Sequence, residues 1–161
     1  MRRPRQGGRG FTLTEMLVTV AILAILAGAA IPLAQNSIKR EKEIELARDL
    51  RLMREAIDAY KRLADEKKIQ VEQGTDGYPP DLQTLVSGVE VSGGAEEGGG
   101  GKKIVRFLRR VPKDPMTNST DWGLRSSQDA PDVDSWGGEN VYDVYTKSRA
   151  KALDGSPFRE W

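Results

Sequence analysis

An uncharged apolar stretch of nineteen residues, 16–34, is the feature that most constrains this chain, and its one hydroxyl side chain is Thr19. As an α-helix it would be about 28 Å long, close to the thickness of the hydrocarbon core of a bilayer. A core helix that is apolar on every side is rare in a small protein, and a cleaved secretory signal has a shorter apolar region with its cleavage site behind it. We therefore predict that residues 11–34 form the membrane-spanning half of a helix.

A basic leader precedes this stretch. Residues 1–10 contain four arginines and no acidic residue. Under the positive-inside rule the leader stays in the cytoplasm, and residues 35–161 lie on the opposite side of the membrane. The chain has 25 basic and 24 acidic residues, so without the four arginines 21 basic residues face 24 acidic ones, a net charge of −3. This mildly acidic remainder argues against a nucleic-acid partner.

Cysteine and histidine are both absent from the chain. Their absence excludes disulfides, thiol nucleophiles, Ser-His-Asp catalysis and the common zinc sites. Because no pair of acidic residues in an identifiable cleft replaces them, a membrane-anchored enzyme or binding module is the disfavoured alternative. We expect residues 35–161 to form one small domain, stabilised by packing or by assembly.

The helix is predicted to continue beyond the apolar stretch. An apolar stripe recurs at spacings of 4, 3, 4, 3 and 4, which is the period of an amphipathic helix. Its members are Leu46, Leu50, Met53, Ile57, Tyr60 and Ala64. Only about three heptads are present, so packing on its own domain is favoured over a free coiled coil. We predict one helix over residues 11–67, with a kink at Pro32 that Gly28 assists.

The remaining residues predict short elements, and the fold class is α+β. Asp81 is expected to cap a short helix, residues 88–101 with seven glycines to form a mobile surface loop, and residues 103–110 to form a second short helix. Three segments are predicted strands of a small antiparallel sheet: 122–127, 141–146 and, at its edge, 158–161.

The N-terminal sequence resembles a known processing signal. Gly10 is followed by Phe11-Thr12-Leu13-Thr14-Glu15-Met16-Leu17-Val18, which resembles the signal of type IV pilins and of the pseudopilins of type II secretion. The rest of the chain is similar to the major pseudopilin G family of that secretion system. The matching segments are Tyr78-Pro79, residues 82–86 and 111–115, Asp121-Trp122-Gly123, residues 142–145 and Trp161.

This resemblance implies a pilin-like fold and a mechanism of processing. A prepilin peptidase would cut between Gly10 and Phe11, remove the leader 1–10 and N-methylate the new amine of Phe11. Glu15 of one subunit would then neutralise the Phe11 amine of a neighbour in a filament. From position alone, Glu15 is equally well explained as an acid near the lipid headgroups or near the positive end of the helix.

The same resemblance implies a calcium ion in the loop after residues 141–146. Calcium needs six to eight oxygen ligands, usually with several carboxylates among them. Here residues 147–155 carry three basic residues and one acid, Asp154, which is a weak candidate ligand. Asp132 and Asp134 would contribute only if the fold brought them close. The sequence Asp154-Gly155 is better explained as a turn.

The resemblance therefore predicts a structural subunit and no catalytic residue. It implies a pseudopilus that grows from the bacterial inner membrane and pushes folded proteins through an outer-membrane channel. Its partners would be copies of itself, minor pseudopilins, the prepilin peptidase, and the inner-membrane assembly platform with its ATPase. Residues 35–161 would lie in the periplasm. The alternative within the superfamily is a true type IV pilus for adhesion, motility or DNA uptake.

Overall fold

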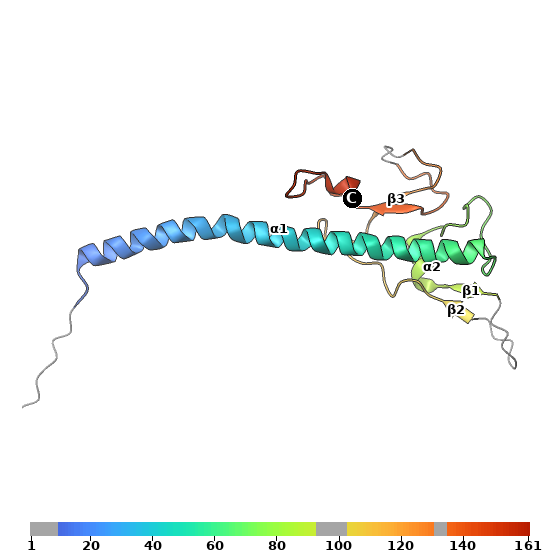
Figure 1. Cartoon of the computed structure of the whole chain (residues 1–161), viewed down its shortest axis with the longest axis horizontal. Helices are drawn as coiled ribbons and strands as arrows, with labels where there is room; N and C mark the ends of the chain where they lie inside the picture. Colours follow the sequence, from blue (N-terminus) through green and yellow to red (C-terminus); the bar gives the residue numbers. More distant parts are fainter. Residues whose placement is uncertain (1–9, 93–102, 131–134) are drawn as a thin grey trace, which may run out of the picture. The chain divides into compact units, whose positions relative to one another are not determined.

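The computed structural model describes residues 10–92, 103–130 and 135–161, with side chains throughout these ranges except at 29–34. The chain divides into two compact units, Met1–Lys39 and Arg40–Trp161. Helix α1 (Leu13–Asp65) has 53 residues and supplies the described helix of the first unit and the longest element of the second (Figure 1). The predicted helix 11–67 is confirmed to within two residues at each end.

Local hydrogen bonds define both ends of α1. The backbone N–H of Glu15 donates to Thr12 Oγ1 at 3.2 Å, so Thr12 caps the first turn. At the other end Lys67 adopts a left-handed conformation with φ 56°, and the N–H of Lys68 donates to the Leu63 carbonyl at 3.0 Å. The helical backbone continues through Pro32, and the kink there stays a prediction.

The predicted apolar stripe forms the core of the second unit. Leu46, Leu50, Met53, Ile57 and Tyr60 are each at most 3 % exposed. They pack against side chains contributed by the rest of the domain, among them Leu85, Leu108, Trp122, Val141, Val144 and Phe158. The amphipathic half of α1 therefore packs on its own domain, as the pattern predicted.

A short helix, α2 (Leu82–Ser87), follows a capping residue that the sequence identified. The N–H and hydroxyl of Thr84 donate to Asp81 Oδ1 at 2.6 and 2.8 Å. The helix ends at Gly88, which has φ 85°, and a Cβ there would lie 2.6 Å from the Val105 carbonyl oxygen. Only glycine fits this combination of left-handed backbone and close approach.

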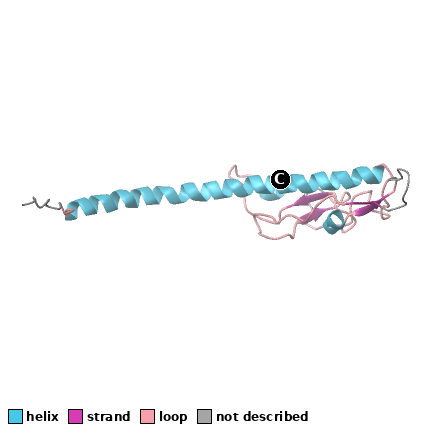
Figure 2. Ribbon diagram, turned by 90° about the horizontal axis from the view of Figure 1, so that it is seen from below, coloured by secondary structure: helices cyan, strands magenta, loops and turns pink. Residues whose placement is uncertain are grey.

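In the part of the chain that the structure describes, four short strands form two antiparallel pairs beside the C-terminal half of α1 (Figure 2). Strand β1 (Val89–Val91) pairs with β2 (Lys103–Val105), with Val89 opposite Val105. Strand β3 (Gly123–Arg125) pairs with β4 (Asp143–Tyr145), with Leu124 opposite Val144. Strands β3 and β4 confirm the predicted strands 122–127 and 141–146 in shorter form.

Three predicted elements need correction. The helix predicted at 103–110 was wrong, because residues 103–105 form β2, and the N–H groups of Phe107 and Leu108 donate to the Leu85 carbonyl instead of closing helical turns. The predicted edge strand 158–161 is a 3₁₀ helix, η1 (Phe158–Glu160). Part of the predicted loop 88–101 is β1, and its residues 93–101 lie outside the described residues.

Candidate functional site

The predicted cleavage junction lies before the helix begins. Gly10 and Phe11 have no regular secondary structure, and Phe11 is 75 % exposed. A Cβ at Gly10 would have no atom within 4 Å, so packing within this chain does not require glycine. An exposed backbone outside regular secondary structure, with no side chain at Gly10, is accessible to the active site of a protease.

Glu15 lies in the first turn of α1. Its backbone N–H is satisfied by the Thr12 cap, and its exposed carboxylate has no hydrogen-bond or ion-pair partner among the described side chains. The unsatisfied N–H groups of a helix N-terminus create a partial positive charge that stabilises such a carboxylate. Sequence reasoning missed Thr12, although a threonine three residues before a glutamate is a known capping signal.

Apolar side chains surround this first part of α1 and are exposed on all sides. The large ones are each 51–81 % exposed, namely Phe11, Leu13, Met16, Leu17, Val18, Val20, Ile22, Leu23, Ile25 and Leu26. An exposed apolar surface of this extent marks contact with lipid or with another protein. Gly28, which is exposed, has no atom within 4 Å of a Cβ built on it. Across the described residues, no helix combines the length and hydropathy that crossing a membrane requires.

Asp154 is engaged in a turn. Its Oδ1 accepts hydrogen bonds from the Ser156 N–H at 2.8 Å and from the Ser156 hydroxyl at 2.7 Å, and Gly155 has φ 91°. The Ser156 hydroxyl and N–H hold the pKa of the Asp154 carboxyl below its usual value, because both stabilise the ionised form. The Ser156 hydroxyl in turn accepts from the Trp161 indole N–H at 3.0 Å.

The described residues do not fit a calcium ion at this loop. The basic residues Lys147, Arg149 and Lys151 precede Asp154, and no group of three or more acidic, histidine or cysteine residues that could hold a metal occurs within the described ranges. Calcium needs six to eight oxygen ligands with negative charge among them. The predicted helpers at positions 132 and 134 lie outside the described residues.

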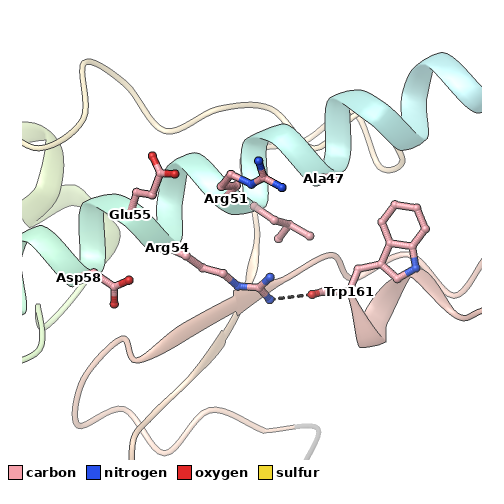
Figure 3. A pocket seen from close by; sticks show the side chains of 7 residues that line it. Ala47, Arg51, Arg54, Glu55, Asp58 and Trp161 are labelled. Atoms are coloured by element: carbon pink, nitrogen blue, oxygen red, sulfur yellow. Dashed lines mark hydrogen bonds between the residues drawn. The ribbon is translucent and has the colours of Figure 1, made fainter.

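A shallow cavity of about 440 Å³ lies beside α1 in the second unit, and sequence reasoning missed it. Its lining side chains come from α1 and from the segment after β4: Ala47, Leu50, Arg51, Arg54, Glu55, Asp58 and Trp161 (Figure 3). Arg54 joins the two segments that line the cavity, because its Nη2 donates to the Trp161 backbone oxygen at 2.8 Å. No local sequence signal predicts a contact between residues this far apart.

Comparison with known proteins decides the family. The model of the prokaryotic N-terminal methylation motif matches residues 5–31, which include Gly10, Phe11 and Glu15. The type II secretion system core protein G of Klebsiella pneumoniae is 32 % identical over 132 residues, 80 % of this chain and 82 % of that protein. This chain belongs to the type IV pilin-like superfamily, in the core protein G family. Proteins of this family are structural and not enzymes.

Other relatives of this pilin-like protein include both secretion and fimbrial proteins. The type II secretion system core protein G of Aeromonas hydrophila is 28 % identical over 118 residues, 73 % of each chain. Fimbrial protein Q of Moraxella bovis is 28 % identical over 116 residues, 66 % of this chain and 73 % of that protein. No solved structure matches the chain significantly.

Proposed function

We propose that this chain is the major subunit of a type II secretion pseudopilus that assembles from the bacterial inner membrane. It is made with its leader, residues 1–10, in the cytoplasm and residues 35–161 in the periplasm. A prepilin peptidase cuts between Gly10 and Phe11 and methylates the Phe11 amine. Copies of the chain, with minor pseudopilins, then polymerise on an assembly platform powered by its ATPase and push folded proteins through an outer-membrane channel.

The observation that carries this proposal is the exposed apolar first part of α1. It begins at Leu13, two residues after Phe11, and its side chains have no cover from their own chain in the described residues. Apolar side chains around the whole circumference of a helix need lipid before assembly and apolar neighbours after it. Residues 11–34 would meet both needs, because they would first lie in lipid as an anchor and then pack against the same residues of other subunits in the core of a filament.

The unpaired carboxylate of Glu15 supports the same proposal. Cleavage before Phe11 creates a positive amine, and an acid near an apolar environment is costly unless a partner neutralises it. A helical neighbour would bring its Phe11 amine to this carboxylate. The pair favours one register of subunits over others, since a displaced neighbour would leave both charges unpaired.

Substitution of Glu15 tests the charge pair. Glu15→Val should leave membrane insertion and leader cleavage intact, because the apolar stretch and the junction are unchanged. It should reduce the yield of sheared filaments at least tenfold, which corresponds to a loss of about 1.4 kcal/mol in the free energy of assembly. The matched control is Glu41→Val, which removes an exposed acid farther along α1. Wild-type filament yield from Glu15→Val would refute the pairing.

A true type IV pilus is the second candidate, favoured by the likeness to a fimbrial protein. Deletion of the gene separates the two. A pseudopilus subunit should be required for release of folded exoproteins into the medium, whereas a pilus subunit should be required for surface filaments with secretion intact. Electron microscopy of cells that overproduce the chain would show which filament forms.

A further inference from the structure

The segment that follows β4, residues 146–161, folds back on itself. The Ala152 N–H donates to the Ser156 carbonyl at 2.8 Å, and Lys151 forms an antiparallel bridge with Pro157. The ring of Phe158, which is buried, meets Trp161 edge to face with centroids 5.2 Å apart. We call residues 146–161 the C-terminal clasp.

Two side chains of α1 attach the clasp to the helix. Glu43 Oε1 accepts the backbone N–H of Leu153 at 2.7 Å. Arg54, three turns farther along, donates from Nη2 to the Trp161 backbone oxygen at 2.8 Å. The clasp is therefore attached to α1 at two of its own residues, Leu153 near the middle of the clasp and Trp161 at its end. Figure 3 shows the second attachment, from Arg54 to Trp161.

Arg54 gathers oxygen atoms from two separate segments. Its Nε donates to Asp143 Oδ1 at 2.7 Å, and its Nη2 lies 3.4 Å from Asp143 Oδ2 and 3.3 Å from the Val144 carbonyl oxygen. With the Trp161 oxygen, the guanidinium contacts four oxygens from β4 and from the clasp. A planar guanidinium with several donors suits this task, because it binds a carboxylate and a carbonyl at the same time.

We propose that Arg54 takes the place of a calcium ion in this protein, as a covalently attached cation that ties the clasp to β4 and α1. A calcium ion stabilises a loop by drawing carboxylate and carbonyl oxygens around one positive charge. Here residues 147–155 are too basic for such an ion. The guanidinium of Arg54 draws the same types of oxygen together on either side of them, from Asp143 and Val144 of β4 and from Trp161 at the other end of the clasp. The folded domain is accordingly independent of divalent cations.

Thermal unfolding of the full chain in mild detergent tests the first half of this proposal. Tryptophan emission reports unfolding, because Trp122 is buried and Trp161 packs within the clasp. With a few millimolar calcium or with excess chelator, the melting temperature should agree to within about 1 °C, since a ligand that does not bind the folded state does not stabilise it. A saturable rise of the melting temperature with calcium concentration would overturn the proposal.

Substitution of Arg54 tests the second half. Arg54→Gln should lower the melting temperature by about 5 °C or more, with no recovery on adding calcium, because it removes charge-assisted bonds to two segments. Arg54→Lys should recover only part of the loss, because an ammonium lacks the planar fork. The matched control is Arg51→Gln, an exposed arginine one turn earlier on the same cavity. Equal losses from Arg54→Gln and Arg51→Gln would overturn the proposal.

Hydrogen exchange on the unmodified chain gives a result even if Arg54→Gln does not fold. The N–H groups of Ala152 and Leu153 and the indole N–H of Trp161 should exchange slowly, at rates that the chelator leaves unchanged. Faster exchange at these groups with chelator would contradict a metal-free clasp. These measurements concern folding and not assembly, so their outcome is independent of the proposed pseudopilus function.

Discussion

The buried carboxylate of Asp114 gives a sharp test of how β4 is joined to the rest of the domain. Asp114 and Thr146 are both fully buried, and the Thr146 hydroxyl donates to Asp114 Oδ2 at 2.5 Å. The same carboxylate accepts from the Met116 N–H at 2.7 Å and from the Thr117 hydroxyl at 3.0 Å. Thr146→Val preserves the shape of the side chain and removes one of these three donors.

The expected loss follows from burial. A hydrogen bond to a charged group is worth about 1.5–3 kcal/mol, and no water replaces the missing donor at a fully buried site. Thr146→Val also deprives the Ser148 N–H of its acceptor, 3.0 Å away. We expect a loss of about 2 kcal/mol, or about 8 °C for a domain of roughly 120 residues. Thr117→Val removes a donor to the same oxygen at an exposed position, where water replaces it, and should cost less than about 1 kcal/mol.

Urea unfolding measures both variants. The emission of Trp122, which is 3 % exposed, reports the loss of the core. An unchanged slope of the unfolding free energy against urea concentration would show that the comparison concerns stability alone. The reasoning would be refuted if Thr146→Val cost no more than Thr117→Val, because the burial of the hydrogen bond would then carry no energetic weight.

Two further substitutions test local features of the same domain. Burial and the neighbouring Glu45 raise the pKa of Asp49 above its ordinary value of 3.8, so the ionised carboxylate lowers the stability of the domain at pH 7. Asp49→Asn should therefore raise the urea midpoint at pH 7. This gain should vanish as the pH falls below 3.8, because the wild-type carboxyl then becomes neutral. Gly88→Ala should lower the unfolding free energy by at least about 2 kcal/mol in the same assay, because φ is 85° and the new Cβ would lie 2.6 Å from the Val105 carbonyl oxygen. A loss within about 0.5 kcal/mol, the usual range for surface substitutions, would contradict this expectation.

The long helix and its buried stripe followed from the sequence because their interactions are local or periodic. Each backbone hydrogen bond of α1 joins residues four apart, and the stripe from Leu46 to Tyr60 repeats at that period. The cap at Asp81 was predictable for the same reason, since its carboxylate reaches a backbone N–H three residues later. The junction at Gly10 and Phe11 was identified from a resemblance, and the matching family model includes it.

The helix predicted at 103–110 shows where such reasoning fails. Ile104, Phe107 and Leu108 have helical spacing, but a helix of eight residues is marginal without tertiary support. Pairing of β2 with β1, and hydrogen bonds from Phe107 and Leu108 to the Leu85 carbonyl, satisfied the backbone in another way. These partners are set by the fold, and a short window of sequence does not contain them.

The sequence by itself determined the apolar stretch 16–34, the amphipathic stripe, the acid at Glu15 and the small number of acids in residues 147–155, because each depends on composition or on spacings within a few turns. The tertiary structure decided how the region after β4 is held. Arg54 meets Trp161 across 107 residues of sequence, and Glu43 meets Leu153 across 110. Contacts over such separations depend on the tertiary fold and not on local spacing, so the structure was needed to place Arg54 among the oxygens of Asp143, Val144 and Trp161.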